Sequence, residues 1–207
     1  MKFLYSHVVL FFLVLFSIPG CTQKPPQLSI LAPDAVILAF GDSLTYGTGT
    51  ADPADSYPSV LQRLVGRKVI NAGIPGELSS QGVTRLATSL EKHSPQLLIL
   101  CHGGNDLLQK RSKHQLKKNL VNMIHIAQTH NVSVILVAVP EPKIAFMSNA
   151  TLYEEIAKKE QIPIESKILL QVLKNNQLKA DTVHPNAQGY QLIAEALNKL
   201  MTESGTI

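Results

Sequence analysis

The stretch 35-AVILAF-40, followed by Gly41-Asp42-Ser43-Leu44-Thr45, decides the fold of this 207-residue chain. Six uninterrupted apolar residues that end at a glycine indicate a strand buried on both faces. Such strands belong to parallel sheets that are covered by helices on both sides. In open sheets of this kind, functional groups sit on the loops beyond the carboxyl ends of the strands. Ser43 therefore stands where a reactive side chain is expected.

The rest of the chain alternates strands with helices. Apolar runs predict further strands at 68–72, 96–101, 132–139 and 162–164, and helical spacing predicts helices at 57–65, 78–92, 113–130, 152–159, 168–174 and 186–201. Helices between successive strands imply crossover connections, and therefore parallel strands. We expect an α/β fold: a three-layer α/β/α sandwich, flavodoxin-like, with a central parallel sheet of about five strands.

Composition excludes several classes of protein. The chain is 45% hydrophobic and 16% charged, with a formal net charge of +4, which is typical of a globular domain and not of a disordered one. The densest basic stretch, 110–118, has no interleaved aromatic residues and reads as a solvated helix face, so nucleic acid is not an expected partner. The histidines outside the last loop show no ligand spacing with a carboxylate cluster, so we expect no metal and no cofactor.

The first twenty residues have the pattern of a secretory signal. Lys2 precedes the apolar run Val8–Ile18, which is too short to span a bilayer. Counted from Phe3 to Gly20, the uncharged stretch is longer, so an uncleaved anchor is an alternative. We expect a signal peptide at 1–20.

The residues that follow suggest how the mature chain is held. Ile18-Pro19-Gly20-Cys21 resembles a bacterial lipobox, in which the cysteine is lipidated and becomes the first residue. Thr22 resembles the pattern of lipoproteins sent to an outer membrane. We expect lipidation at Cys21, a flexible tether at 21–33, and a monomeric domain at 34–207 on the periplasmic face of a bacterial envelope. Because Pro19 is unusual in that motif, plain secretion of a soluble protein is the alternative.

Four loops at predicted strand or helix ends contain polar or glycine residues, and each also has an ordinary interpretation. Ser43 can be a helix cap, and the glycines of Asn71–Gly76 suit any turn. His102–Asp106 can be a turn with a capping side chain. His184 can be a surface residue beside a helix start, although Asp181, three residues earlier, is placed to accept its Nδ1–H and leave Nε2 as a base.

The four segments together are more specific than any one alone. Serine hydrolysis needs a nucleophile, an oriented base and N–H donors for the oxyanion, and all of these fall on one predicted rim. The blocks FGDSLT (40–45), NAGIPG (71–76), GGND (103–106) and DTVHPN (181–186) resemble those of GDSL-type SGNH hydrolases, in the branch of bacterial thioesterases, lysophospholipases and arylesterases.

The resemblance implies a role for each matching residue. Ser43 would be the nucleophile and His184 the general base, oriented by Asp181. The oxyanion donors would be the Ser43 and Gly76 backbone N–H groups and the Asn105 side-chain amide. Asp42 and Asp106 are expected to be structural, bonding the backbone of the loops.

The substrate is less well defined than the chemistry. The resemblance implies lysophospholipids or other small acyl esters and thioesters. The alternatives are an esterase that removes acetyl groups from envelope sugars, which needs a shallow polar cleft, and an inactive module that binds in the envelope. The segment Pro140–Asn149 lacks the Tyr-Gly and aromatic residues that often line the acyl pocket, and offers Ile144, Phe146 and Met147. His102 also departs from the pattern, which has an apolar residue there. We expect it to be buried and hydrogen-bonded, with a second acid/base group as the alternative.

Cys101 ends the apolar run 97–100. With Cys21 lipidated, Cys101 has no intramolecular partner. We interpret it as a small buried hydrophobic residue, with a catalytic thiol as the alternative.

Overall fold

The computed structural model describes residues 24–142, 147–149 and 151–207. The expected signal peptide and Cys21 lie outside the described residues and stay predictions. So do Ile144 and Phe146, which were candidates for the acyl pocket.

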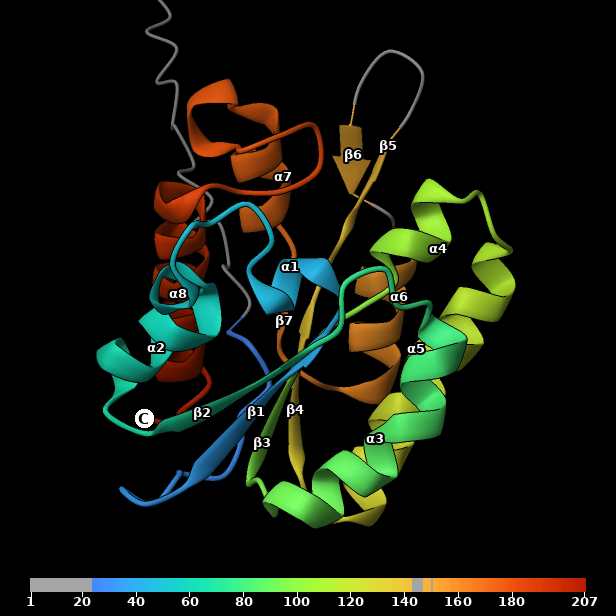
Figure 1. Ribbon diagram of the computed structural model, residues 1–207. Coiled ribbons are helices and arrows are strands. Elements are labelled where there is room, and N and C mark those ends of the chain that lie inside the picture. Colours follow the sequence, from blue (N-terminus) through green and yellow to red (C-terminus); the bar gives the residue numbers. More distant parts are fainter. Residues whose placement is uncertain (1–23, 143–146, 150) are drawn as a thin grey trace, which may run out of the picture.

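A five-stranded parallel sheet forms the centre of the domain (Figure 1). Its strand order is β2-β1-β3-β4-β7. The strands are β1 (Val36–Gly41), β2 (Lys68–Gly73), β3 (Leu97–Cys101), β4 (Ser133–Val137) and β7 (Ile164–Glu165). All residues of β3 are buried, as are all but the first of β1, because both strands are apolar throughout and have a neighbour on each side. The predicted parallel sheet of about five strands is confirmed.

Helices cover both faces of this sheet, as Figure 1 shows. One layer holds α2 and α8, and the other holds α3, α5 and α6. The bounds are α2 (Tyr57–Val65), α3 (Ser79–His93), α5 (Lys113–Thr129), α6 (Leu152–Glu160), α7 (Ile168–Lys174) and α8 (Ala187–Glu203). In α8 the buried residues Tyr190, Ile193, Leu197 and Leu200 recur at helical spacing, so one apolar stripe faces the core. The predicted three-layer sandwich is therefore confirmed.

The expected strands and helices agree with the observed ones to within two residues at each end. The sequence did not predict the shortest elements: α1 (Ser43–Tyr46), α4 (Gly104–Leu108), the 3₁₀ turns Pro53–Asp55 and Asn176–Leu178, and the hairpin β5 (Pro140–Pro142) with β6 (Met147–Asn149). Two prolines in β5 argue against a strand when only the sequence is read, and a three-residue edge strand tolerates them.

One helix start differs in detail from the sequence interpretation. Ser56 precedes α2 as expected, but its side chain does not cap the helix. Its hydroxyl donates to the Pro53 carbonyl oxygen at 2.8 Å and so closes the preceding 3₁₀ turn.

The described part of the expected tether is attached to the end of the chain. Gln27 Nε2 donates to the Glu203 carbonyl, and the backbone N–H groups of Leu28 and Leu31 donate to the carbonyls of Ser204 and Thr206. Leu31 is buried in the core. Among the described residues we find no helix with the length and hydrophobicity that a membrane span requires.

Strand register brings three of the candidate loops to one level of the sheet. Gly41, the last residue of β1, pairs with Gly73 of β2 on one side and Cys101 of β3 on the other. A Cβ at position 41 would overlap the Cys101 carbonyl oxygen, so the close approach of β1 and β3 requires glycine there. The loops that begin with Asp42, Ile74 and His102 therefore leave the sheet side by side.

Candidate active site

Asp42 and Ser43 occupy the tight exit from β1. Asp42 is almost fully buried; its Oδ1 accepts the Leu44 N–H at 3.1 Å and so caps α1, and its Oδ2 accepts the Gly104 N–H at 3.2 Å. Burial raises the pKa of the Asp42 carboxyl, although the hydrogen bonds from the Leu44 and Gly104 N–H groups act in the opposite direction. Asp42 thus supplies the helix cap and ties the Ser43 loop to the loop of Asn105, which is the structural role expected for it.

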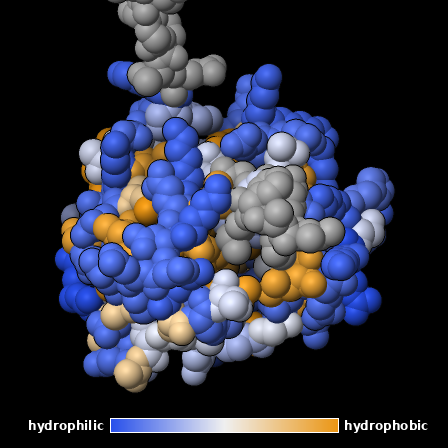
Figure 2. All heavy atoms as spheres, turned by 90° about the horizontal axis from the view of Figure 1, so that it is seen from above, coloured by the Kyte–Doolittle hydropathy of each residue, from blue (hydrophilic) through white to orange (hydrophobic). Residues whose placement is uncertain are grey.

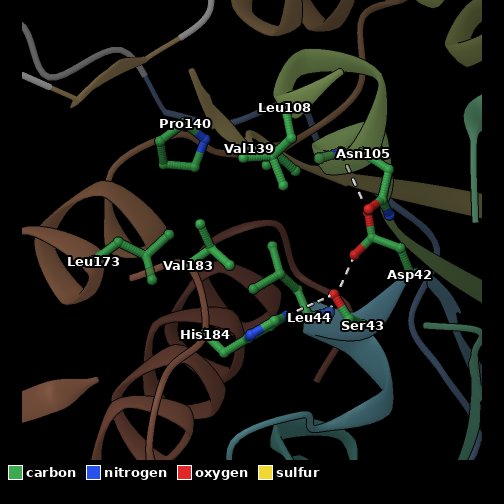
Figure 3. Close-up of a pocket in the computed structure, with 11 residues that line it drawn as sticks. Asp42, Ser43, Leu44, Asn105, Leu108, Val139, Pro140, Leu173, Val183 and His184 are labelled. Atoms are coloured by element: carbon green, nitrogen blue, oxygen red, sulfur yellow. Dashed lines mark hydrogen bonds between the residues drawn. The ribbon is translucent and has the colours of Figure 1, made fainter. Parts of the chain in front are cut away.

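Ser43 meets a histidine from the far end of the chain (Figure 3). His184 Nε2 lies 3.0 Å from Ser43 Oγ, across 141 positions of sequence. His184 Nδ1 lies 2.7 Å from Asp181 Oδ2. A Ser–His–Asp chain of this geometry lets the imidazole take the serine proton on Nε2 while Nδ1–H donates to the carboxylate.

Asp181 is held by the loop that it shares with His184. Its Oδ1 accepts the backbone N–H groups of Val183 and His184, both at 2.8 Å. Partial burial alone would raise the pKa of the Asp181 carboxyl, but the hydrogen bonds from the His184 side chain and from these backbone groups outweigh it and lower that pKa. The two oxygens therefore have separate tasks: one shapes the loop and the other bonds the imidazole.

The three candidate oxyanion donors lie on adjacent loops. Ile74–Glu77 forms a β-turn closed by the Glu77 N–H on the Ile74 carbonyl at 3.2 Å, with Pro75 second and Gly76 third at φ +80°. This is the sequence signature of a type II turn, in which only a residue such as glycine suits the third position. Among the described residues, neither the Gly76 N–H nor the Ser43 N–H has an acceptor. Both are free to donate.

Asn105, the third candidate donor, lines the same cleft as Ser43. Its Nδ2 donates to the Glu77 carbonyl oxygen at 3.0 Å, which leaves the second N–H of the amide available. Gly76 does not line the cleft; it precedes Glu77 in the turn beside it. Asp106 instead accepts the N–H and the hydroxyl of Ser79 and fixes the start of α3, which is the structural role expected for it.

A cleft opens in front of the Ser43–His184 pair. Figure 3 shows aliphatic side chains converging on it from both sides. Its apolar lining comes from Leu44, Leu108, Val139, Pro140, Leu173 and Val183. Sequence reasoning did not find these walls, because α4 and α7 bring Leu108 and Leu173 together from distant parts of the chain.

Cys101 is buried at the end of β3, and burial raises the pKa of its thiol far above the usual value, so it is a packed residue and not a nucleophile at neutral pH. In the part of the chain that the structure describes, no three His, Cys, Asp or Glu side chains are grouped in a way that could hold a metal ion.

The chain is thus an α/β domain with a Ser43–His184–Asp181 contact chain at one edge of its sheet, and comparison with known proteins gives the family. The chain belongs to the GDSL-like Lipase/Acylhydrolase family, whose model matches residues 39–192. It is 28% identical over 173 residues to "Thioesterase 1/protease 1/lysophospholipase L1" of Escherichia coli K12, an alignment that covers 79% of this chain and 81% of the relative.

Two further relatives add detail. The "Uncharacterized lipoprotein YqeF" of Bacillus subtilis is 28% identical over 145 residues, covering 63% of this chain and 56% of that protein. The crystal structure of the psychrotrophic esterase EstA from Pseudoalteromonas sp. superposes with a TM-score of 0.73 at 22% identity, covering 82% of this chain and 97% of the esterase. Membership of this family makes the chain an ester hydrolase by class.

Proposed function

We propose that this protein is a serine esterase that hydrolyses carboxylic esters and thioesters, with lysophospholipids or other small acyl esters as substrates. The observation that carries the proposal is the contact chain Asp181–His184–Ser43, with heavy-atom separations of 2.7 and 3.0 Å, at the mouth of an apolar cleft. An inactive binding module has no need of this arrangement.

The proposed reaction has two steps. In the first, Ser43 Oγ attacks the acyl carbon while its proton moves to His184 Nε2; Asp181 stabilises the imidazolium, and the alcohol or thiol leaves with that proton. In the second, His184 takes a proton from water, which attacks the acyl carbon; the acid then leaves as the bond to Ser43 breaks, and His184 returns the proton to Ser43 Oγ. The free N–H groups of Ser43 and Gly76 and the Asn105 amide would stabilise the oxyanion in both steps.

The apolar lining of the cleft favours a substrate with an acyl chain over an acetylated sugar. An acetyl group covers little of an aliphatic surface, whereas each methylene buried against one contributes about 0.8 kcal/mol. Leu108 is 46% exposed and lines the cleft, where its side chain could contact a bound acyl chain. Figure 2, which views the face above the strand ends, shows hydrophobic residues among the hydrophilic ones there.

A substrate panel tests this proposal. Turnover of acetyl, octanoyl and palmitoyl esters is measured for the wild type, for Ser43→Ala and for Leu108→Asp. Leu64→Asp is the matched control, because Leu64 is similarly exposed (41%) but lies on α2, outside the cleft. We expect Ser43→Ala to abolish turnover, and Leu108→Asp to lower octanoyl relative to acetyl turnover while Leu64→Asp leaves that ratio unchanged. Exclusive preference for acetylated glycans would refute the acyl-chain assignment.

We also propose that Cys21 is lipidated and holds the domain on the periplasmic face of a bacterial envelope, at an outer membrane. Support comes from the segment Ile18–Cys21 and from similarity to a protein named as a lipoprotein. The attachment of residues from Gln27 onward to the end of α8 would make the tether short. Mass spectrometry of the mature amino terminus tests this: a diacylated or triacylated Cys21 is expected, and an unmodified terminus at another residue would refute it.

A further inference from the structure

Behind the candidate oxyanion loops lies a buried ionic network that the proposed chemistry does not use. The Arg85 guanidinium donates to both oxygens of Glu77, from Nε at 2.6 Å and from Nη2 at 2.7 Å. His102 Nε2 lies 3.0 Å from Glu77 Oε2. The His102 side chain is fully buried and that of Glu77 nearly so, while Arg85 reaches the surface in part. The desolvation cost of a buried ion pair can exceed its Coulombic gain, so stability alone is weak grounds for keeping this network.

The hydrogen-bond donors fix the proton on His102. The Gly103 N–H donates to Nδ1 at 2.9 Å, so Nδ1 is the acceptor and Nε2 holds the proton that it donates to Glu77. Burial alone would raise the pKa of the Glu77 carboxyl, but the hydrogen bonds from His102 and Arg85 outweigh it and lower that pKa. In this network the neutral His102 imidazole and the Arg85 guanidinium both donate hydrogen bonds to the Glu77 carboxylate.

The network touches the ends of three strands. Arg85 Nη2 also donates to the carbonyl oxygens of Gly41, at the end of β1, and Ala72, near the end of β2. His102 directly follows β3. These strands lead to Ser43, Gly76 and Asn105, so the network links the loops on which the proposed reaction depends.

The main chain of Glu77 connects this network to Asn105. Its carbonyl oxygen accepts Asn105 Nδ2 at 3.0 Å. An amide bonded in this way keeps its nitrogen, and not its oxygen, next to the turn, and the remaining N–H keeps one direction. Without that bond the Asn105 side chain can rotate, and the donor is lost for part of the time.

The surrounding packing is shaped for these side chains. A Cβ at Gly82 in α3 would lie 2.5 Å from His102 Nε2, so a glycine in the middle of a helix makes room for the imidazole. The Arg85 guanidinium lies 3.8 Å from the centroid of the Phe40 ring, a favourable cation–π contact. An apolar residue at 102 would leave the Gly103 N–H without its acceptor and Glu77 Oε2 without one of its donors.

We propose that His102, Glu77 and Arg85 form a positioning network that fixes the Asn105 amide in its donating orientation through the Glu77 carbonyl. This rests on the proposed function, in which Asn105 stabilises the oxyanion. Because that interaction exists only in the transition state, loss of the network lowers kcat and changes KM little. Removal of one oxyanion donor costs about 10²–10³ in kcat, so an amide that is correctly oriented for only about 1–10% of the time would lower kcat about 10- to 100-fold.

A double-mutant cycle tests the proposal. His102→Leu is made in the wild type and in Asn105→Ala, and kcat and KM for a short-chain ester are measured for all four proteins. We expect His102→Leu to lower kcat about 10- to 100-fold in the wild type and less than about threefold in Asn105→Ala, because the donor that it positions is then absent. Equal losses in both backgrounds would overturn the proposal, because they indicate damage to the fold or to other groups.

Three further variants keep the test decisive. His102→Gln retains an N–H donor near the place of Nε2 and is expected to recover part of kcat; if His102→Leu does not fold, His102→Gln and Arg85→Lys replace it in the cycle. His125→Leu is the matched control, because His125 also bonds a glutamate, Glu160, at 2.9 Å but lies on the surface of α5, and its kcat is expected to stay unchanged. If Asn105→Ala alone leaves kcat unchanged, the oxyanion role in the proposed function fails, and the network proposal falls with it.

Discussion

The separate tasks of the two Asp181 oxygens lead to a sharp expectation for Asp181→Asn. Oδ1 is held by two backbone N–H donors, so in the variant the amide oxygen takes that place and the amide nitrogen faces His184 Nδ1. Nδ1 must then accept a hydrogen bond, and the imidazole proton moves to Nε2, opposite Ser43 Oγ. The variant keeps the loop and loses the base.

The size of the loss follows from the exposure of the carboxylate. The same exchange in a buried triad costs about 10⁴-fold in kcat. Here 51% of the Asp181 side-chain surface is exposed, so water weakens its effect on the imidazolium. We expect a barrier about 3–5 kcal/mol higher, which lowers kcat by about 10²- to 10⁴-fold at roughly 1.36 kcal/mol per tenfold.

The assay is steady-state hydrolysis of a short-chain nitrophenyl ester, with thermal unfolding measured on the same samples. Asp181→Ala is the control: it also removes the acceptor of two backbone N–H groups, so it should lose a similar amount of kcat and also up to about 1 kcal/mol of stability. Asp181→Asn within about threefold of the wild-type kcat would refute the reasoning, because His184 would then be oriented without the carboxylate.

Three other predictions concern the framework of the site. Leu100→Ala, in the fully buried centre of β3, should lower the free energy of unfolding by about 2–5 kcal/mol in urea titrations; a loss below 1 kcal/mol would contradict the packing described. Asp42→Asn keeps one of two backbone acceptors and turns an N–H toward the other donor, so calorimetry should show about 1–3 kcal/mol less stability, and an unchanged melting temperature would be inconsistent with the cap. The Glu77 carboxyl faces His102 and Arg85, and their hydrogen bonds lower its pKa in the folded protein. The ionised carboxylate therefore contributes fully to stability at a pH above the pKa of the unfolded chain, near 4.5, and this contribution is lost as the pH falls through the lower pKa of the folded protein. Unfolding at pH 7 and pH 3 should therefore show a smaller acid destabilisation for Glu77→Gln than for the wild type, and equal pH dependence would refute this.

Local sequence signals were sufficient for the sheet and for the position of the reactive loops. An apolar run such as 97–100 indicates a buried strand, because so many adjacent apolar residues do not suit an exposed segment. The residue that follows the run is then expected at the end of that strand. The Asp181–His184 pair could also be anticipated, because it is made within one loop. The contact between His184 and Ser43 was expected only from the family resemblance, and the structure places the two side chains in contact.

Other parts of the site depend on tertiary contacts that no local pattern reports. Glu77, Arg85 and His102 are separated by 8 and 17 positions and meet only because α3 packs beside β1 and against the His102 side chain that follows β3. Two signals could have pointed to them: a histidine where the family has an apolar residue, and Gly82 inside an otherwise regular helix. The cleft walls were sought in Pro140–Asn149, whereas α4 and α7 provide much of the described lining.

The central claim is that Ser43 forms a covalent acyl-enzyme, and labelling with a nitrophenyl phosphonate ester tests it most directly. The reagent transfers its phosphonyl group to an activated serine and stalls there, so intact mass and peptide mapping identify the residue that reacted. We expect one adduct per chain on the peptide that contains Ser43, loss of esterase activity in proportion to labelling, and no adduct in Ser43→Ala. Full activity in a protein labelled at Ser43, or inactivation with the adduct at another residue, would contradict the account.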